Sequence, residues 1–237
     1  MMSRRWPGFS FLCVTVLLCL GNGAFASIDP NNLREIINYI RRYGLNIHYA
    51  VAVRLEEQYC SETSQHALTI PLPTGEMEDM KKKISDKQIG IYNPEPIGNI
   101  VAARPKLLKH RKEHAEWRLL TGGQNSPVER ILANKDRGCL IFFSKLSPCT
   151  DRCLNKADMK NIVQMVNPLF DRFPQDFKAF VFETVYEKDA KEEEKEAVVE
   201  AWKSIRNSPL FRCYNDNRGC IKCFDNNQTA DNPCLRD

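Results

Sequence analysis

Residues 138–153 read Gly-Cys-Leu-Ile-Phe-Phe-Ser-Lys-Leu-Ser-Pro-Cys-Thr-Asp-Arg-Cys. The apolar run from Gly138 to Ser144 is typical of a central strand that is covered on both faces. Proline is favoured at the first position of a helix, so Pro148 predicts that a helix follows this strand. One face of that helix would carry five apolar residues: Met159, Ile162, Val163, Val166 and Phe170. A strand that leads into a helix indicates an α/β fold.

Two cysteines stand at the start of this predicted helix. Cys149 and Cys153 are four positions apart, which would place both thiols on one helix face. They would lie in its first turn or so, where unpaired N–H groups and the helix dipole favour thiolates. Thiolate is the form of cysteine that binds zinc, so the pair is a candidate for two metal ligands.

The segment His114-Ala115-Glu116 stands at the start of another predicted helix, which begins near Glu113. A histidine from this helix would provide a third ligand and leave a fourth position for water, as in catalytic zinc sites. Glu116 would not need to bind the metal and would be available to take up and return a proton.

The rest of the chain predicts an alternation of helices and strands. Asp29-Pro30 is a helix start, and Gly44 would end that helix. The polar segment 56–95 is expected to be a long excursion with weak structure. Further strands are expected over 47–55, 98–103 and 177–186, and an amphipathic helix over 190–206. This order implies parallel strands in the second half of the chain and permits antiparallel pairing of the first two.

The N-terminus has the three parts of a secretory signal peptide. Basic residues at positions 4 and 5 precede a 12-residue apolar run that ends at Leu20, and Ala24-Phe25-Ala26 follows. We therefore expect cleavage after Ala26, although a buried N-terminal helix is an alternative. Neither this run nor any later stretch is long enough to span a bilayer, so no membrane anchor is expected.

Eight cysteines follow the predicted cleavage site, and secretion would favour disulfides among them. If zinc takes two, six disulfide candidates remain: Cys60, Cys139, Cys213, Cys220, Cys223 and Cys234. The alternative is that all eight form disulfides, for which 105 connectivities are possible. The sequence Cys220-Ile221-Lys222-Cys223 lacks a second ligand pair at zinc-finger spacing and is interpreted as disulfide cysteines. Asn227 begins an N-glycosylation acceptor sequence.

His-x-Glu followed by Pro-Cys-x(2–4)-Cys is the signature of the zinc-dependent nucleobase deaminases. Ser147-Pro148-Cys149 resembles the AID/APOBEC group in particular, and with its predicted signal peptide the chain looks like a secreted novel AID/APOBEC-like deaminase. The similarity spans roughly residues 47–206, and its sharp motifs cover only about ten positions.

This resemblance implies that His114, Cys149 and Cys153 bind Zn²⁺ and that Glu116 is the general acid/base. It also implies a cytidine deaminase-like α/β fold, with a five-stranded mixed sheet flanked by helices, followed here by a disulfide-rich C-terminal tail. The expected organisation is a signal peptide over 1–26, a deaminase-like domain over 27–212 and a Cys-rich tail over 213–237.

The resemblance further implies that the substrate is cytosine in single-stranded DNA or RNA, or a free nucleoside. Tyr186 corresponds to a loop aromatic that stacks on the base in relatives, although it is also interpretable as a strand-end aromatic of the core edge. Arg104 begins a segment, 104–112, that corresponds to a substrate-contacting loop. Six of its nine residues are basic or histidine, which suits a phosphate backbone but is equally typical of a solvated loop. Asn99 is a candidate for contact with ribose or base.

The composition is that of a globular protein, with 43% hydrophobic and 27% charged residues. These values exclude a collagen, a coiled-coil rod and a wholly disordered chain, and the net charge of +4 does not demand a nucleic-acid partner. The resemblance predicts a secreted cytidine deaminase that acts in host defence. The alternatives are a catalytically inactive deaminase-fold protein that binds nucleic acid or a partner, and a deaminase of adenine. The sequence leaves the oligomeric state open.

Overall fold

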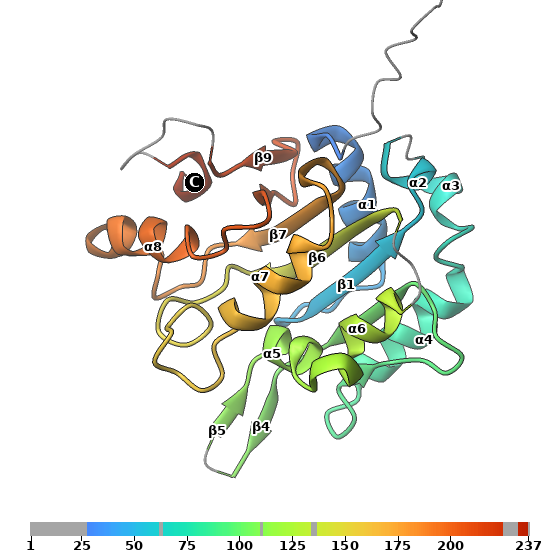
Figure 1. Cartoon of the computed structure of the whole chain (residues 1–237), viewed down its shortest axis with the longest axis horizontal. Helices are drawn as coiled ribbons and strands as arrows, with labels where there is room; N and C mark the ends of the chain where they lie inside the picture. The colour runs from blue at the N-terminus through green and yellow to red at the C-terminus, as the bar shows by residue number, and fades with distance from the viewer. Residues whose placement is uncertain (1–27, 62–63, 110, 134–136, 225–231, 237) are drawn as a thin grey trace, which may run out of the picture.

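The apolar stretch from Cys139 to Ser144 lies at the centre of a seven-stranded sheet. A computed structural model describes residues 28–61, 64–109, 111–133, 137–224 and 232–236. In this part of the chain the sheet has the strand order β2-β3-β1-β6-β7-β8-β9. Its strands are, in that order, Ile91–Tyr92, Ile100–Ala103, Ala50–Leu55, Cys139–Leu146, Lys178–Thr184, Leu210–Cys213 and Cys220–Lys222. A separate hairpin pairs β4 (Lys106–Leu108) with β5 (Arg111–Glu113) and projects from the body of the molecule (Figure 1).

The pairing of the strands follows the predicted pattern. β6 runs parallel to β7, and β7 runs parallel to β8, as the alternation of strands and helices in the second half indicates. β1 pairs antiparallel with both β3 and β6, which confirms the pairing of the first two predicted strands. The implied number of five strands is wrong, because β2 and β9 add antiparallel strands at the two edges of the sheet.

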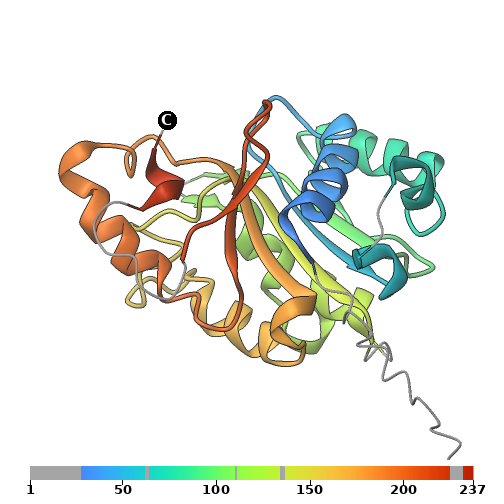
Figure 2. The same ribbon diagram turned by 90° about the horizontal axis from the view of Figure 1, so that it is seen from above.

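Helices cover both faces of the sheet (Figures 1 and 2). Alternate residues of β6 point to opposite faces, so Phe142 packs in one apolar cluster and Phe143 in the other. The α helices are α1 (Pro30–Arg42), α2 (Gln58–Ser61), α3 (Gln65–Leu68), α4 (Thr74–Ser85), α5 (Ala115–Leu120), α6 (Pro127–Leu132), α7 (Val163–Asp171) and α8 (Lys195–Trp202). The clusters place α1–α4 on the Phe143 face and α5–α8 on the Phe142 face. Four short 3₁₀ helices are η1 (Gly123–Asn125), η2 (Gln175–Phe177), η3 (Glu192–Glu194) and η4 (Pro233–Leu235).

The first helix begins where its capping residues predict. Asp29 accepts hydrogen bonds from the backbone N–H groups of Asn31 and Asn32, and Pro30 occupies the first helical position. Four fully buried apolar residues form the face that packs on the sheet: Leu33, Ile36, Ile37 and Ile40. The helix ends at Arg42, immediately before the predicted stop.

The expectation of weak structure over residues 56–95 is wrong. This segment contains α2, α3, α4 and β2. Met77, Met80 and Ile84 recur at helical spacing along α4 and are fully buried. The polar residues between them, including Lys81–Lys83, form the exposed face of the same helix. The prolines that suggested an irregular segment lie outside this helix, and Pro73 is its N-cap residue.

The prediction of a helix that begins at Pro148 is also wrong, because turns occupy residues 149–160 and α7 begins only at Val163. Asx-type side chains compete with helical hydrogen bonding in this segment. Asn155 accepts from the backbone N–H of Ala157, and Asp158 accepts from that of Lys160. Met159, expected on the inner face of the helix, is 94% exposed.

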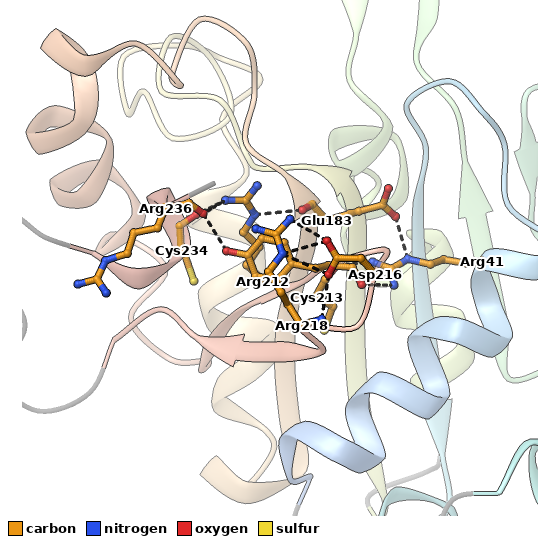
Figure 3. A network of polar contacts seen from close by, with 9 residues as sticks. Arg41, Glu183, Arg212, Cys213, Asp216, Arg218, Cys234 and Arg236 are labelled. Atoms are coloured by element: carbon orange, nitrogen blue, oxygen red, sulfur yellow. Dashed lines mark hydrogen bonds and ion pairs between the residues drawn. The ribbon is translucent and has the colours of Figure 1, made fainter.

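The C-terminal segment is bound closely to the sheet. The guanidinium of Arg212 on β8 donates to the backbone carbonyls of Cys234, at 2.9 Å, and Arg236, at 3.0 Å (Figure 3). Its guanidinium carbon also lies 4.4 Å from the ring centre of Tyr214, whose other neighbour is the guanidinium of Arg218 at 3.7 Å. Cys223 and Cys234, from this segment, are part of the same core cluster as Phe142.

All six cysteines that were proposed as disulfide candidates are paired. The bridges are Cys60–Cys139, Cys213–Cys220 and Cys223–Cys234. The two cysteines of the Cys220–Cys223 motif therefore belong to different bridges. Among the described cysteines, Cys149 and Cys153 have free thiols, which contradicts the alternative that all eight are oxidised.

Loss of the Cys60–Cys139 bridge should lower the free energy of unfolding by about 2–4 kcal/mol. The bridge joins residues 79 positions apart, and it restricts the unfolded chain more than the Cys213–Cys220 bridge, which joins residues 7 apart. Urea denaturation of a Cys60→Ala/Cys139→Ala double variant measures the effect. A Cys213→Ala/Cys220→Ala variant is the matched control, and an equal or larger loss in the control would contradict the explanation by loop length.

Among the described residues, no helix combines the length and the apolar character that a membrane span requires. The predicted signal peptide and Asn227 lie outside the described residues.

Candidate active site

His114 lies at the junction between the β4–β5 hairpin and α5. It is the N-cap residue of α5 and has an extended backbone conformation, so its side chain lies at the start of the helix as expected. Glu116 is in the first turn of the same helix and is 1% exposed. The short spacing therefore directs a histidine and a buried carboxylate to the same end of one helix.

Turns, and not a helix, bring the two free thiols together. The backbone N–H of Cys153 donates to the Sγ atom of Cys149 at 3.4 Å, and the N–H of Leu154 donates to the carbonyl of Cys149 at 3.0 Å. The carbonyl of Cys153 accepts from Ile162 at 2.8 Å, which fixes the end of the loop immediately before α7. The four-residue spacing thus gives the expected proximity through a different backbone conformation.

His114, Cys149 and Cys153 form a compact set of possible metal ligands, with all ligand atoms within 4.8 Å of one another. The Nδ1 atom of His114 lies 3.1 Å from Sγ of Cys153 and 3.6 Å from Sγ of Cys149. A tetrahedral zinc ion with ordinary Zn–N and Zn–S bonds would separate nitrogen and sulfur ligands by about 3.6 Å. The donor set and its spacing therefore fit zinc, with a fourth position left for a ligand other than these side chains.

Hydrogen bonding differentiates the two thiols. The pKa of Cys149 falls to about 6, because hydrogen bonds from Cys153 and then from His114 stabilise its thiolate more than burial destabilises it. The pKa of Cys153 is raised, by its hydrogen bond to Cys149 and by burial. The pKa of His114 is raised, chiefly by its hydrogen bond with Cys149. The thiolate form of Cys149 is the form that binds a soft divalent cation.

Two polar side chains contact the Glu116 carboxylate. The hydroxyl of Ser144 on β6 donates to Oε1 at 2.6 Å, and Nε2 of His48 lies 3.4 Å from Oε2. Burial alone would raise the pKa of Glu116, but the neighbouring His48 ring and the hydrogen bonds from His48 and Ser144 lower it to about 2. The buried group is therefore a carboxylate, and both of its oxygens have a partner.

The metal ligands and Glu116 line one cavity of about 190 Å³. This volume is below the range of about 300–1,000 Å³ that is typical of sites for drug-sized molecules. Tyr186 also lines the cavity, together with three cationic side chains: Lys112, Arg152 and Lys188. The exposed carboxylate of Asp151 is also part of the lining, so the cavity combines a small interior with a border on which three cations outnumber one exposed carboxylate.

Asn99 and Arg104 are not among the described residues that line this cavity. The Asn99 amide donates to the carbonyl of Pro71 at 2.9 Å, and the Arg104 guanidinium donates to that of Ser85 at 3.1 Å. Of the 104–112 segment, Lys112 lies at the cavity.

His48 is the residue of this site that the sequence does not indicate. It lies in the loop between α1 and β1, 68 positions from Glu116, and no motif surrounds it. The contact depends on the pairing of β1 with β6 and on the packing of α5, neither of which appears as a local pattern.

Asp189 fixes the loop that holds the thiols. Its carboxylate is 3% exposed and accepts from Thr150 twice, from the backbone N–H at 3.1 Å and from the hydroxyl at 2.8 Å. The hydroxyl of Ser147 accepts from the backbone N–H of Tyr186 at 2.9 Å. The loop after β7 and the Cys149 loop are therefore joined on both sides of Cys149.

Replacement of Asp189 by alanine should weaken zinc binding about 10- to 100-fold, since groups that orient metal ligands contribute effects of this size. The loss of both contacts frees Thr150, which follows Cys149 directly. Competition with a chromogenic chelator measures the affinity, with Asp171→Ala at the exposed end of α7 as the control. Unchanged zinc affinity in a folded Asp189→Ala protein would contradict this role.

Comparison with known proteins agrees with the geometry of the site. No curated protein and no solved structure matches the chain. The sequence model of the family described as Secreted Novel AID/APOBEC-like Deaminase 1 matches residues 30–237, which include the ligand set, Glu116 and the C-terminal segment. The chain therefore belongs to the Secreted Novel AID/APOBEC-like Deaminase 1 family.

Proposed function

We propose that this protein is a secreted zinc-dependent deaminase that hydrolyses the exocyclic amine of cytosine in single-stranded DNA or RNA. The observation that carries the proposal is the presence of three zinc-type ligands and a buried carboxylate in one small cavity. His114, Cys149 and Cys153 would hold the metal. When bound, zinc would supply a Lewis acid that makes water a better nucleophile at neutral pH.

Glu116 would carry the protons of the reaction. Hydrolysis forms a bond from the water oxygen to C4 of cytosine, breaks the bond from C4 to the amine, and releases ammonia. A carboxylate beside the reacting water would take one water proton and pass it to the ring nitrogen, and would then move the second proton, from the new C4 hydroxyl, to the leaving amine. Glu116 suits this role because it is ionised, buried and held at the cavity, and because it does not belong to the ligand set.

The shape and charge of the cavity support a polynucleotide as substrate. A volume of about 190 Å³ suits a single base more than a complete nucleotide, so the sugar and phosphates would lie at the border. The phosphates would contact the cationic side chains of Lys112, Arg152 and Lys188, and a base would stack on Tyr186.

We further propose that residues 1–26 are a signal peptide and that the secreted protein has a deaminase-like domain of cytidine deaminase-like fold over 27–212 and a Cys-rich tail over 213–237. Three disulfides are typical of an oxidising compartment, which supports secretion. A secreted deaminase of nucleic acid would suit defence against foreign genomes outside the cell.

Conversion of cytosine to uracil tests the activity directly. Zinc-loaded secreted protein is incubated with a single-stranded oligonucleotide that has one cytosine, with its duplex, and with free cytidine, and mass spectrometry measures the product. We expect conversion of the single strand above all. If neither these substrates nor an adenine-containing single strand is converted, and nucleic-acid binding persists after zinc removal, the protein is a binding module.

Replacement of Lys188 by glutamine should raise KM for the oligonucleotide several-fold. It should also reduce the slope of log KM against the logarithm of salt concentration by about one, the effect of one lost phosphate contact. The kcat value for the oligonucleotide should stay unchanged, as should any conversion of free cytidine. Steady-state kinetics between low and physiological salt measure this. Lys191→Gln is the matched control, because Lys191 is exposed and is not among the described residues that line the cavity.

A further inference from the structure

His48 has no assigned role in the reaction described above, yet it lies at the centre of the site. Its side chain lines the cavity, is 16% exposed, and approaches Oε2 of Glu116 to 3.4 Å. It does not belong to the ligand set of His114, Cys149 and Cys153. The question is what a second imidazole contributes beside the buried carboxylate.

The sheet determines the position of His48. Ala50, two residues after it, is opposite Ser144 in the antiparallel pairing of β1 with β6. The carbonyl of Tyr49 accepts from the backbone N–H of Lys145 at 2.9 Å, which extends the pairing to the residue next to His48. Ser144 itself donates to Glu116, so β6 and the segment that leads into β1 direct two polar side chains to the same carboxylate.

These two contacts involve different oxygens of Glu116. The Ser144 hydroxyl donates to Oε1 at 2.6 Å, and the His48 ring faces Oε2. One donor leaves a carboxylate free to rotate about its terminal bond, whereas donors on both oxygens fix its plane. A carboxylate with a fixed plane needs no reorganisation when the substrate enters.

The surroundings of the His48 ring determine which of its nitrogens carries the proton. Nδ1 is buried and has no hydrogen-bond partner among the described residues. A proton on Nδ1 alone would leave a buried donor unsatisfied and direct the Nε2 lone pair at the carboxylate of Glu116. A proton on Nε2 instead makes His48 a donor to Oε2.

We propose that His48 is a positioning residue which, with Ser144, holds the Glu116 carboxylate in the orientation that proton transfer requires. This inference rests on the proposed function for its kinetic consequence, although the contact itself does not. His48 acts through Glu116 and leaves the zinc ligands and the basic border of the cavity unchanged.

The kinetic test compares His48→Phe, which keeps a ring and removes both nitrogens, with His48→Gln, which restores an amide donor. In zinc-loaded protein, His48→Phe should lower kcat about 10- to 100-fold, the size expected for a displaced catalytic group, with KM and zinc content unchanged. His48→Gln should recover part of the loss. In a Glu116→Gln background His48→Phe should cause no further loss, because the two residues act as one unit. A raised KM with unchanged kcat, or a loss of zinc, would overturn the proposal.

A second measurement does not require activity. Long-range ¹H–¹⁵N spectra of the zinc-loaded wild-type protein report the tautomer of each histidine ring, and the His48→Gln variant identifies the His48 signals. We expect the proton on Nε2 and a change in the ¹⁵N shifts of His48 in Glu116→Gln. A proton on Nδ1 alone, or shifts that do not respond to Glu116→Gln, would overturn the inference. If these signals are as expected and no substrate is deaminated, the proposed function fails and the contact stands.

Discussion

Replacement of Glu116 by glutamine should lower kcat for cytosine deamination by a factor of about 10²–10⁴, the usual contribution of general acid–base catalysis. Glutamine has nearly the same volume and keeps an oxygen for the Ser144 hydroxyl, but it cannot accept and return a proton. An amide has only one oxygen, so glutamine could not accept from Ser144 and His48 on separate oxygens as the carboxylate does. Zinc content should remain at one ion per chain, because the ligand set does not include Glu116. Single-turnover kinetics together with elemental analysis measure both quantities.

Glu129→Gln provides the matched control for this variant. Glu129 on α6 forms an ion pair with Arg172 and is not among the described residues that line the cavity, so the same chemical change there should leave kcat unaltered. If Glu116→Gln keeps wild-type turnover, another group carries the proton and the proposed mechanism is wrong. If it also loses zinc, Glu116 contributes to the metal site and not only to proton transfer.

The parts of this fold that the sequence predicts correctly depend on local patterns. The apolar run of β6 indicates a buried strand, and Asp29-Pro30 indicates the capped start of α1. Both signals come from residues that are close in sequence. A local pattern is also present in α4, where the buried Met77, Met80 and Ile84 have helical spacing, but this helix is not among the predicted elements. The lysine run and the neighbouring prolines indicate an irregular polar segment, and three apolar residues within it are too few to predict a helix.

The ligand loop shows that a correct prediction of proximity can rest on an incorrect backbone. Cys149 and Cys153 are adjacent, but turns and not a helix bring their thiols together. A spacing of four residues is compatible with both conformations. The hydrogen bonds that decide between them come from side chains within the loop, such as Asn155, and from distant Asp189. A motif therefore specifies which residues meet more reliably than how the chain brings them together.

The residues that orient the site are those that a single sequence cannot reveal. His48 and Asp189 reach Glu116 and Thr150 across 68 and 39 positions, through strand pairing and loop packing. Neither has a characteristic neighbour in sequence. By contrast, Asn99 and Arg104 are plausible from their positions in the chain, but their side chains make contacts with backbone carbonyls elsewhere.

Replacement of Cys149 by serine should remove zinc and abolish deamination. Serine lacks the soft, easily ionised sulfur, and three good ligands would become two. The pKa of Cys149, lowered to about 6, makes this thiol the one that is ionised at neutral pH before metal binds, so its loss also removes the charge that attracts the cation. We expect one zinc per chain in the wild type and none in Cys149→Ser, by elemental analysis of the secreted proteins.

The Cys60→Ala/Cys139→Ala variant is the control that separates metal binding from cysteine loss in general. It removes two cysteines from the same chain, but they form a disulfide away from the cavity, so its zinc content should equal that of the wild type. Counting thiols in denaturant after chelation should give two per chain in the wild type and one in Cys149→Ser. A wild-type protein with neither zinc nor reactive thiols would mean that Cys149 and Cys153 are oxidised to each other. Such a bridge would use the same proximity that the loop provides for a metal, and the site would then have lost the chemistry of its family.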